Sequence, residues 1–395
     1  MPTHFSNETA LRDDKKPFFP PERYGILTKR NHGSTDSVKK RGESTMSMRK
    51  IGILTSGGDS PGMNAAVMSV ARSAAYYGIP LVGIKRGYNG LLRKRLDIRE
   101  DLQELHLETV LDIADQPGTF LRTARCDEFR DPKYREIAVQ TLRAMEIDGL
   151  VVVGGDGSFN GAKYLCELGV PTIGIPGTID NDLGYTEMTL GYDTAVNVCV
   201  DAIRKIRATS RSHDRPAVVE VMGRHCGDIA LTAAVSTGSE IVVVPEVPWK
   251  VEDVARQLKR QLAKGNTRAT IILAEGCYSA MAPFDLYGYL TTHGKPCYEG
   301  EPMSAVRFAS VMKRMCNAEA RATVIGYVQR GAEPTARDSN FAFEAGNLAV
   351  RLLRDGISNQ VVGMQKGQVM YMPIDEALRH KKRFNRRLYD LVNSL

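Results

Sequence analysis

Short apolar runs alternate with longer amphipathic stretches from residue 51 to the end of this chain. The apolar runs are rich in Val and Ile and are bounded by Gly, Pro or Asp, which is typical of strands buried on both faces of a parallel sheet. The stretches between them have the length and periodicity of helices. This alternation predicts an α/β protein in which helices cover mainly parallel sheets.

The expected elements divide into two halves. A long helix at 189–209 is expected to link them, and the length of 395 residues also favours two domains. The strands are expected at 51–55, 80–84, 149–153, 172–175, 217–221, 240–244, 270–274 and 323–327.

Residues 1–48 differ from the rest of the chain. They are rich in Lys, Arg, Ser, Thr and Pro, they lack periodicity, and the prolines of Pro17-Phe18-Phe19-Pro20-Pro21 exclude a regular helix there. They also lack the apolar core of a signal peptide. We expect a disordered or loosely attached extension without a catalytic role, unless translation starts at Met46 or Met48.

Composition is that of an ordinary soluble enzyme. The chain is 43% hydrophobic and 25% charged, and its net charge of +7 suits anionic ligands without indicating nucleic-acid binding. Seven scattered cysteines without a CxxC pair predict a reducing compartment, the cytoplasm, and neither disulfides nor a zinc site. No run approaches the roughly 18 apolar residues of a membrane span.

Glycine-rich loops follow the expected strands. Gly154-Gly155-Asp156-Gly157-Ser158 follows the strand at 149–153, and Gly57-Gly58-Asp59 follows the strand at 51–55. Backbone N–H groups in such turns form phosphate sites. Asp156 would repel a phosphate unless a divalent cation lies between them. The next strand leads to Thr178, Asp180 and Asp182. The sequence thus provides a glycine-rich loop to bind phosphate, a carboxylate to bind a metal and a further carboxylate to act as a base. Together they indicate phosphoryl transfer at the carboxyl ends of the strands.

The motifs identify a family resemblance. ILTSGGDSPGMNAA, GTFLRTAR, VVGGDGS, PGTIDND, VVEVMGRHCGD and GYVQRG resemble the 6-phosphofructokinase family in order and spacing, over about residues 49–375. The resemblance implies a glycolytic kinase, a transferase that moves phosphate from ATP to the 1-hydroxyl of fructose 6-phosphate and releases fructose 1,6-bisphosphate and ADP. It also implies Mg²⁺, a cytoplasmic homotetramer built as a dimer of dimers, and allosteric control.

Two positions bear on the phosphoryl donor. Members of the family that use ATP carry glycine where this chain has Gly157 and Gly177, whereas members that use pyrophosphate typically carry Asp and Lys. A side chain at 157 would crowd the α-phosphate of a nucleotide, so two glycines favour ATP. Pyrophosphate remains the alternative donor, because Tyr327 replaces the usual sugar-phosphate histidine and a tyrosine there also resembles pyrophosphate-type relatives.

The resemblance implies two similar three-layer α/β/α Rossmann-like lobes with mainly parallel sheets. The nucleotide-binding lobe would comprise 49–191 plus 329–379, and the sugar-phosphate lobe 192–328 plus 380–395. The residues matching the family's nucleotide contacts are Gly58, Tyr88, Arg125, Cys126, Asp156, Gly157, Ser158 and Gly161. Arg130 lies near Arg125 in the same loop region, and we interpret Cys126 as a small apolar filler where an aromatic is common.

The remaining site residues also follow from the resemblance. Asp180 would be the base, Asp156 and Asp182 would hold Mg²⁺, Thr178 would orient the reacting groups, and Arg224 and the Gly58 N–H would stabilise the transferred phosphate. Arg215 and Arg321 are expected to reach a neighbouring subunit's site. The full sugar-phosphate set is Thr178, Asp180, Asp182, Arg215, Met222, Gly223, Arg224, Glu275, Arg321, Tyr327 and Arg330.

The family's effector site is expected to be incomplete. Met68 replaces a common arginine and Asn266 replaces a lysine, while Arg72 and Arg207 remain. Fewer cations imply weaker capture of an anionic effector such as ADP or phosphoenolpyruvate.

Other classes fit less well. A lipid or NAD kinase shares a GGDG turn but not PGTIDND or MGR, and a dehydrogenase would need GxGxxG after the first strand. A non-catalytic, sugar-phosphate-binding subunit would be expected to lose Asp156, Asp180 or Arg224, and all three are present.

Overall fold

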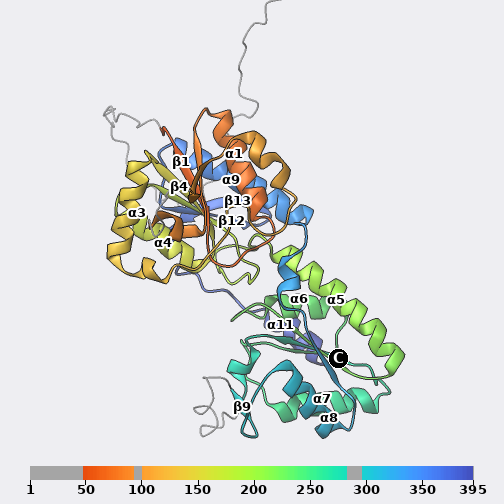
Figure 1. Ribbon diagram of the computed structural model, residues 1–395. Coiled ribbons are helices and arrows are strands. Elements are labelled where there is room, and N and C mark those ends of the chain that lie inside the picture. The colour runs from red at the N-terminus through yellow and green to blue at the C-terminus, as the bar shows by residue number, and fades with distance from the viewer. Residues whose placement is uncertain (1–47, 93–99, 283–295, 395) are drawn as a thin grey trace, which may run out of the picture. The chain divides into compact units, whose positions relative to one another are not determined.

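The structure is a computed structural model that describes residues 48–92, 100–282 and 296–394. Two covered sheets dominate it (Figure 1). The strands of the first sheet follow the order β13-β12-β5-β4-β1-β2-β3, and pairing is parallel except at the two edges, β2 with β3 and β12 with β13. Their bounds are β1 Ile51–Thr55, β2 Leu81–Ile84, β3 Leu102–Glu104, β4 Gly149–Gly154, β5 Thr172–Pro176, β12 Gln360–Gln365 and β13 Gln368–Pro373.

Alternate residues of this sheet enter different cores. In β4, Val151 and Val153 pack with α1 (Met63–Tyr76) and α9 (Ala336–Arg354). Leu150 and Val152 of the same strand pack with α3 (Pro132–Ala144) and α4 (Asp156–Glu167) on the other face (Figure 1). The period of two along a strand therefore serves two apolar layers, which is why this strand is apolar at every position.

The second sheet is parallel throughout, with strand order β11-β6-β8-β7. Helices from both sides share one core with it. The strands are β6 Ala217–Val221, β7 Ile241–Val243, β8 Thr270–Ala274 and β11 Arg321–Val324, and the helices are α5 Tyr192–His213, α6 Asp228–Thr237, α7 Val251–Ala263, α8 Ala305–Cys316 and α11 Arg386–Ser394.

Short elements complete the described chain. They are the hairpin β9 Cys297–Tyr298 with β10 Glu301–Pro302, the helices α2 Leu107–Val110 and α10 Ile374–Ala377, and the 3₁₀ turns η1 Gly87–Leu91, η3 Leu111–Ile113, η4 Asp127–Arg130, η5 Cys277–Ala280 and η6 Gly326–Arg330. Every helix within the described ranges is too short or too polar to cross a membrane.

Most expected elements are confirmed. The strands β1, β6 and β8 have the predicted bounds, and β2, β4, β5 and β7 differ by one residue at one or both ends. The long helix begins three residues later than predicted and ends four later, because Gly191 and Asp214 have left-handed backbone conformations that delimit it. Residues 1–47 are outside the described residues, so the expectations for the N-terminal segment are not tested. The boundaries of the two lobes also stay a prediction.

One predicted strand was wrong. The strand expected at 323–327 is β11 at Arg321–Val324, and the chain then turns into η6. Gly326 has φ +56°, which an extended strand does not allow. Arg321 is thus the first residue of the strand, and Arg330 ends the 3₁₀ turn.

Each sheet has a point where the direction of winding reverses. The chain passes from β1 to β2 on one side and from β4 to β5 on the other, so β1 and β4 flank the reversal in the first sheet. In the second sheet the chain passes from β6 across to β7 and from β8 across to β11, so the connections that follow these two neighbouring strands also run in opposite directions. Loops at the carboxyl ends of such strand pairs diverge and leave a crevice, which is the usual ligand site of this architecture.

A buried carboxylate joins the helices of the two cores. Asp338 of α9 is 0% exposed and accepts hydrogen bonds from the backbone N–H of Gly191 at 2.9 Å and of Thr194 at 2.8 Å, and from the Thr194 hydroxyl. Thr335, the N-cap of α9, donates its backbone N–H to the same Thr194 hydroxyl. The first turns of α5 and α9 thus satisfy each other's free backbone donors.

We predict that Asp338→Asn lowers the free energy of unfolding by roughly 1–3 kcal/mol, because an amide nitrogen would face a backbone donor at a fully buried site. Chemical denaturation measures this. Asp355→Asn is the control, since Asp355 follows the same helix and is exposed beside Arg354. Equal stabilities of the two variants would contradict the role given to Asp338.

Candidate active site

The glycine-rich loops of β1 and β4 are neighbours. The Ser56 N–H donates to the Val153 carbonyl at 2.9 Å, which extends the pairing of the two strands to their carboxyl ends. Gly155 is the N-cap of α4, which begins at Asp156, so the first turn of α4 presents free backbone N–H groups there. A side chain at Gly157 would meet nothing within 4 Å, which leaves open space beside this turn.

Gly177 has a different environment. A Cβ there would lie 2.9 Å from Val153 Cγ1 and 3.1 Å from Met63 Cε, closer than normal carbon contacts. Packing between β4 and α1 therefore favours glycine at 177 regardless of the ligand. Of the two positions read as donor determinants, only Gly157 borders free space.

The Tyr88 side chain supports the first turn of α4, which follows the glycine-rich loop at 154–157. It is 3% exposed, its hydroxyl donates to the Ser158 carbonyl at 2.6 Å, and its ring stacks on Phe129 at a centroid distance of 4.2 Å. Burial raises the pKa of Tyr88. A Cβ at Gly161 would lie 2.7 Å from the Tyr88 ring, so helix and ring approach as closely as glycine allows.

The predicted cationic loop is mostly exposed. Arg125 is exposed, and the highly exposed Arg130 lies 3.6 Å from the Asp127 carboxylate. Cys126 packs against the core that contains Tyr88 and Phe129, as expected of a small apolar filler.

The negative charge of Asp182 influences the other two predicted carboxylates. Burial and the negative charge of Asp182 raise the pKa of Asp156. Burial also raises the pKa of Asp180 to about 6, Asp182 and Glu275 add to the shift, and Arg330 and Arg224 oppose it. The structure therefore brings Asp180, from the first sheet, within electrostatic reach of residues from the second.

Hydrogen bonds to side chains hold the loop that carries these aspartates. The Asp180 N–H donates to the Thr178 hydroxyl at 3.2 Å, and Asn181 is buried with φ +53°. The Asn181 amide donates to the Asp228 carboxylate at 2.9 Å, which also lies 3.1 Å from Lys382 Nζ. Sequence reasoning missed Asn181 and Asp228. The asparagine between Asp180 and Asp182 could have indicated a left-handed turn at this position, since Asn tolerates that backbone region better than most residues.

The carboxyl ends of β6 and β8 carry the sugar-phosphate candidates. Gly223 and Arg224 both have positive φ, and the Arg224 N–H donates to Glu275 Oε1 at 2.7 Å. Arg330 donates to the Asp59 carbonyl, and its guanidinium lies beside Gly58. Met222, Gly223, Arg224, Glu275 and Arg330 thus lie at the same edge of the second sheet, and Arg330 reaches the β1 loop.

Arg215 and Arg321 lie at the opposite edge. Arg321 pairs with Ala217 at the amino ends of β11 and β6, and Arg215 comes two residues before Ala217. The pKa of Glu319 is lowered by its ion pair with Arg321 and further by the nearby charges of Lys313 and Arg215. A strand rises roughly 3.3 Å per residue, so about 20 Å of chain separates Arg215 from Met222. The structure does not bring these two arginines to the other site residues of the same chain.

Asp156 and Asp182 are suited to a hydrated metal. Among the described residues, no cluster of three or more His, Cys, Asp or Glu side chains is arranged to hold an ion. Mg²⁺ needs fewer protein ligands, because it keeps several waters and binds through one or two carboxylates plus substrate phosphates. The two carboxylates next to the glycine-rich turn fit that requirement.

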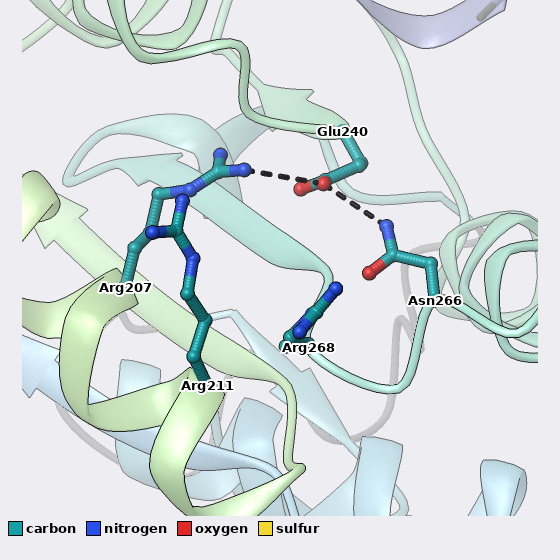
Figure 2. Close-up of a pocket in the computed structure, with 5 residues that line it drawn as sticks. All are labelled: Arg207, Arg211, Glu240, Asn266 and Arg268. Carbon is teal, nitrogen blue, oxygen red and sulfur yellow. Dashed lines mark hydrogen bonds and ion pairs between the residues drawn. The ribbon is translucent and has the colours of Figure 1, made fainter.

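The predicted effector residues fall into two groups. Arg207 and Asn266 line a cavity of about 250 Å³ together with Arg211, Glu240 and Arg268 (Figure 2). Glu240 accepts from Arg207 at 3.4 Å and from Asn266 at 3.0 Å. Met68 and Arg72 instead lie on α1, where Met68 is buried and Arg72 lies over the Phe343 ring. Met68 and Arg72 therefore do not line the cavity that Arg207 and Asn266 share in this chain.

Comparison with known proteins supports one family. The phosphofructokinase family model matches residues 50–353. The chain belongs to this family. It is 48% identical to the ATP-dependent 6-phosphofructokinase of Clostridioides difficile over 348 residues, which is 88% of this chain and 99% of the relative. The enzyme of the same name from Paenibacillus macquariensis is 42% identical over 350 residues, 89% of this chain and 99% of the relative.

Solved phosphofructokinases share the fold. The structure from Saccharomyces cerevisiae has a TM-score of 0.74 at 30% identity, covering 88% of this chain and 50% of the yeast chain. The pyrophosphate-dependent phosphofructokinase from Marinobacter aquaeolei has a TM-score of 0.71 at 20% identity, covering 86% of each chain. The second likeness concerns the fold alone. The expected α/β/α architecture with mainly parallel sheets is confirmed.

Proposed function

We propose that this chain is a glycolytic ATP-dependent 6-phosphofructokinase, which transfers the γ-phosphoryl group of ATP to the 1-hydroxyl of fructose 6-phosphate. Relatives bearing that name are 42–48% identical over nearly their whole length. The observation that carries the proposal is the environment of Asp180, a half-buried carboxylate whose pKa is raised by burial, Asp182 and Glu275 and lowered by the positive charges of Arg330 and Arg224.

Asp180 is the proposed base. As the 1-hydroxyl oxygen attacks phosphorus, its proton passes to the Asp180 carboxylate. A folded pKa of about 6 makes this carboxylate a stronger base than a free aspartate while leaving it mostly ionised at neutral pH. Thr178 accepts the Asp180 N–H and holds the base in place.

The charges around Asp180 suit the transferred group. Arg224 and the Gly58 N–H would stabilise the phosphoryl oxygens, the usual source of catalysis in such reactions. Asp156 and Asp182 would hold Mg²⁺, which would neutralise charge on the β- and γ-phosphates when bound. Gly58, Tyr88, Arg125, Cys126, Asp156, Gly157, Ser158 and Gly161 are the proposed nucleotide contacts.

We infer an oligomer with shared sites. Arg215 and Arg321 lie at the sheet edge opposite to Met222 and Arg224, so a role at an active site requires a second subunit. The edge strand β11 and the 3₁₀ turn η6 that follows it expose apolar residues, Val324 at 55%, Tyr327 at 83% and Val328 at 66% exposure. These features support self-association, and we propose a homotetramer built as a dimer of dimers with a cytoplasmic location.

For Asp180→Asn, we predict that kcat falls by roughly 10²–10⁴-fold while fructose 6-phosphate still binds, because the amide cannot accept the proton. Steady-state kinetics and calorimetric binding measure the two effects. In the unsubstituted enzyme kcat/KM should fall as the pH drops below about 6, where Asp180 gains its proton. Asp201→Asn, at an exposed ion pair with Lys205, is the control. A variant with normal turnover would exclude Asp180 as the base.

For Gly157→Asp, we predict a large loss of kcat/KM for ATP and a smaller change for any pyrophosphate activity. The carboxylate would add bulk and negative charge where the structure leaves open space beside the phosphate turn. Gly157→Ala is the matched control, since a methyl group there adds no charge. Parallel assays with ATP and pyrophosphate decide the donor, and unchanged ATP kinetics in Gly157→Asp would refute its role.

For the shared site, we predict that mixing inactive Arg321→Ala protein with inactive Asp180→Asn protein restores part of the activity. In mixed oligomers, some sites combine an intact Asp180 with an intact Arg321 from the other chain. Subunit exchange is verified by mass spectrometry of differently labelled chains. Exchange without recovery, or a fully active monomer in sedimentation, would contradict the proposal.

A further inference from the structure

A fully buried amide lies between two segments of the proposed sugar-phosphate site. Gln329, in η6, is 0% exposed. Its Oε1 accepts from the Met222 N–H at 3.2 Å and from the Cys199 thiol at 2.9 Å, and its Nε2 donates to the Gly326 carbonyl at 3.1 Å. Every heavy polar atom of this side chain therefore has a partner, as a buried amide requires.

The position of Gln329 explains why these bonds form. The parallel pairing of β11 with β6 ends at Val324 and Glu220, followed by a last bond from the Ile325 N–H to the Glu220 carbonyl. In a regular parallel ladder the next donor from β6 is the Met222 N–H, which would meet a carbonyl of the partner strand. The partner has already turned into η6, and the Gln329 side chain supplies the missing acceptor.

Each segment joined in this way carries candidate sugar-phosphate residues. Met222 begins the loop that continues to Gly223 and Arg224, and η6 contains Tyr327 and Arg330. Cys199 adds α5, the long helix packed on the same sheet. One amide thus links three elements, and it sets where Arg224 and Arg330 lie relative to each other.

We propose that Gln329 is a positioning residue for the sugar phosphate, holding the 222–224 loop and η6 in register without touching the substrate. The inference rests on the proposed function, because it assigns these segments to fructose 6-phosphate. Glutamine suits the position since the site needs an acceptor for two donors and a donor for one carbonyl. An apolar residue of similar length would leave the Met222 N–H unpaired, and a carboxylate would bring charge into the core.

The experiment compares Gln329→Met with the unsubstituted enzyme. Methionine keeps the length of the side chain but offers neither a good acceptor nor a donor. We expect the KM for fructose 6-phosphate to rise roughly 5- to 100-fold, the range for one buried donor left unpaired, with the KM for ATP unchanged. A merely structural role would instead lower the amount of folded enzyme or shift both KM values together.

The thiol provides a second, milder test. Cys199→Ala removes one donor to the Gln329 oxygen, whereas Cys199→Ser keeps one. The alanine variant should show a smaller rise of the same KM alone, and the serine variant should restore it. Cys316→Ala is the matched control, because this thiol in α8 also lies in the second core, and it bonds to the Ala255 carbonyl away from the site.

The outcomes separate the two proposals. A folded Gln329→Met enzyme with an unchanged KM for fructose 6-phosphate, or with equal changes for both substrates, would overturn the positioning role and leave the proposed function intact. If Gln329→Met does not fold, the Cys199 pair decides, and equal kinetics for its alanine and serine variants would overturn the role. An unsubstituted enzyme that fails to phosphorylate fructose 6-phosphate would refute the proposed function itself.

Discussion

The carboxylate of Asp338 is the constraint that fixes the start of α5 against the start of α9. Parallel strands need long connections, and here α9 packs on the first sheet while α5 enters the core of the second. Both helices begin with free backbone donors, and the Asp338–Thr194–Thr335 network satisfies them in one buried place. Because a charge without partners is costly in an apolar interior, this network favours a single placement of the two helix starts.

The chemistry of the site follows from where the parallel strands end. Both winding reversals direct their loops outward at the carboxyl ends, so glycine-rich turns, aspartates and arginines gather without any one loop containing them all. Asp180 is the clearest result. Burial and Asp182 make its charge unfavourable, and Arg330 and Arg224 limit that effect, which leaves a carboxylate suited to accept a proton near neutral pH.

Gln329 shows how closely the fold and the site are connected. A strand that continued past Val324 would complete the ladder with β6, but it would carry Tyr327 and Arg330 along the sheet edge. The early turn at Gly326 places both residues in η6 instead, and the Gln329 side-chain amide replaces the lost backbone acceptor. The irregularity in the sheet and the placement of two candidate contacts thus have the same cause.

The sequence by itself determined the fold class, the family and most strands, because buried parallel strands and glycine-rich turns are local patterns. The bounds of β1, β6 and β8 matched for this reason. Edge elements such as β12 and β13 have mixed polarity, and β11 ends early at a turn where the Gln329 side chain replaces a backbone acceptor, so neither could be read locally. Only the tertiary structure decided the raised pKa of Asp180 and the Asn181–Asp228 bond, since each depends on residues far apart in the chain.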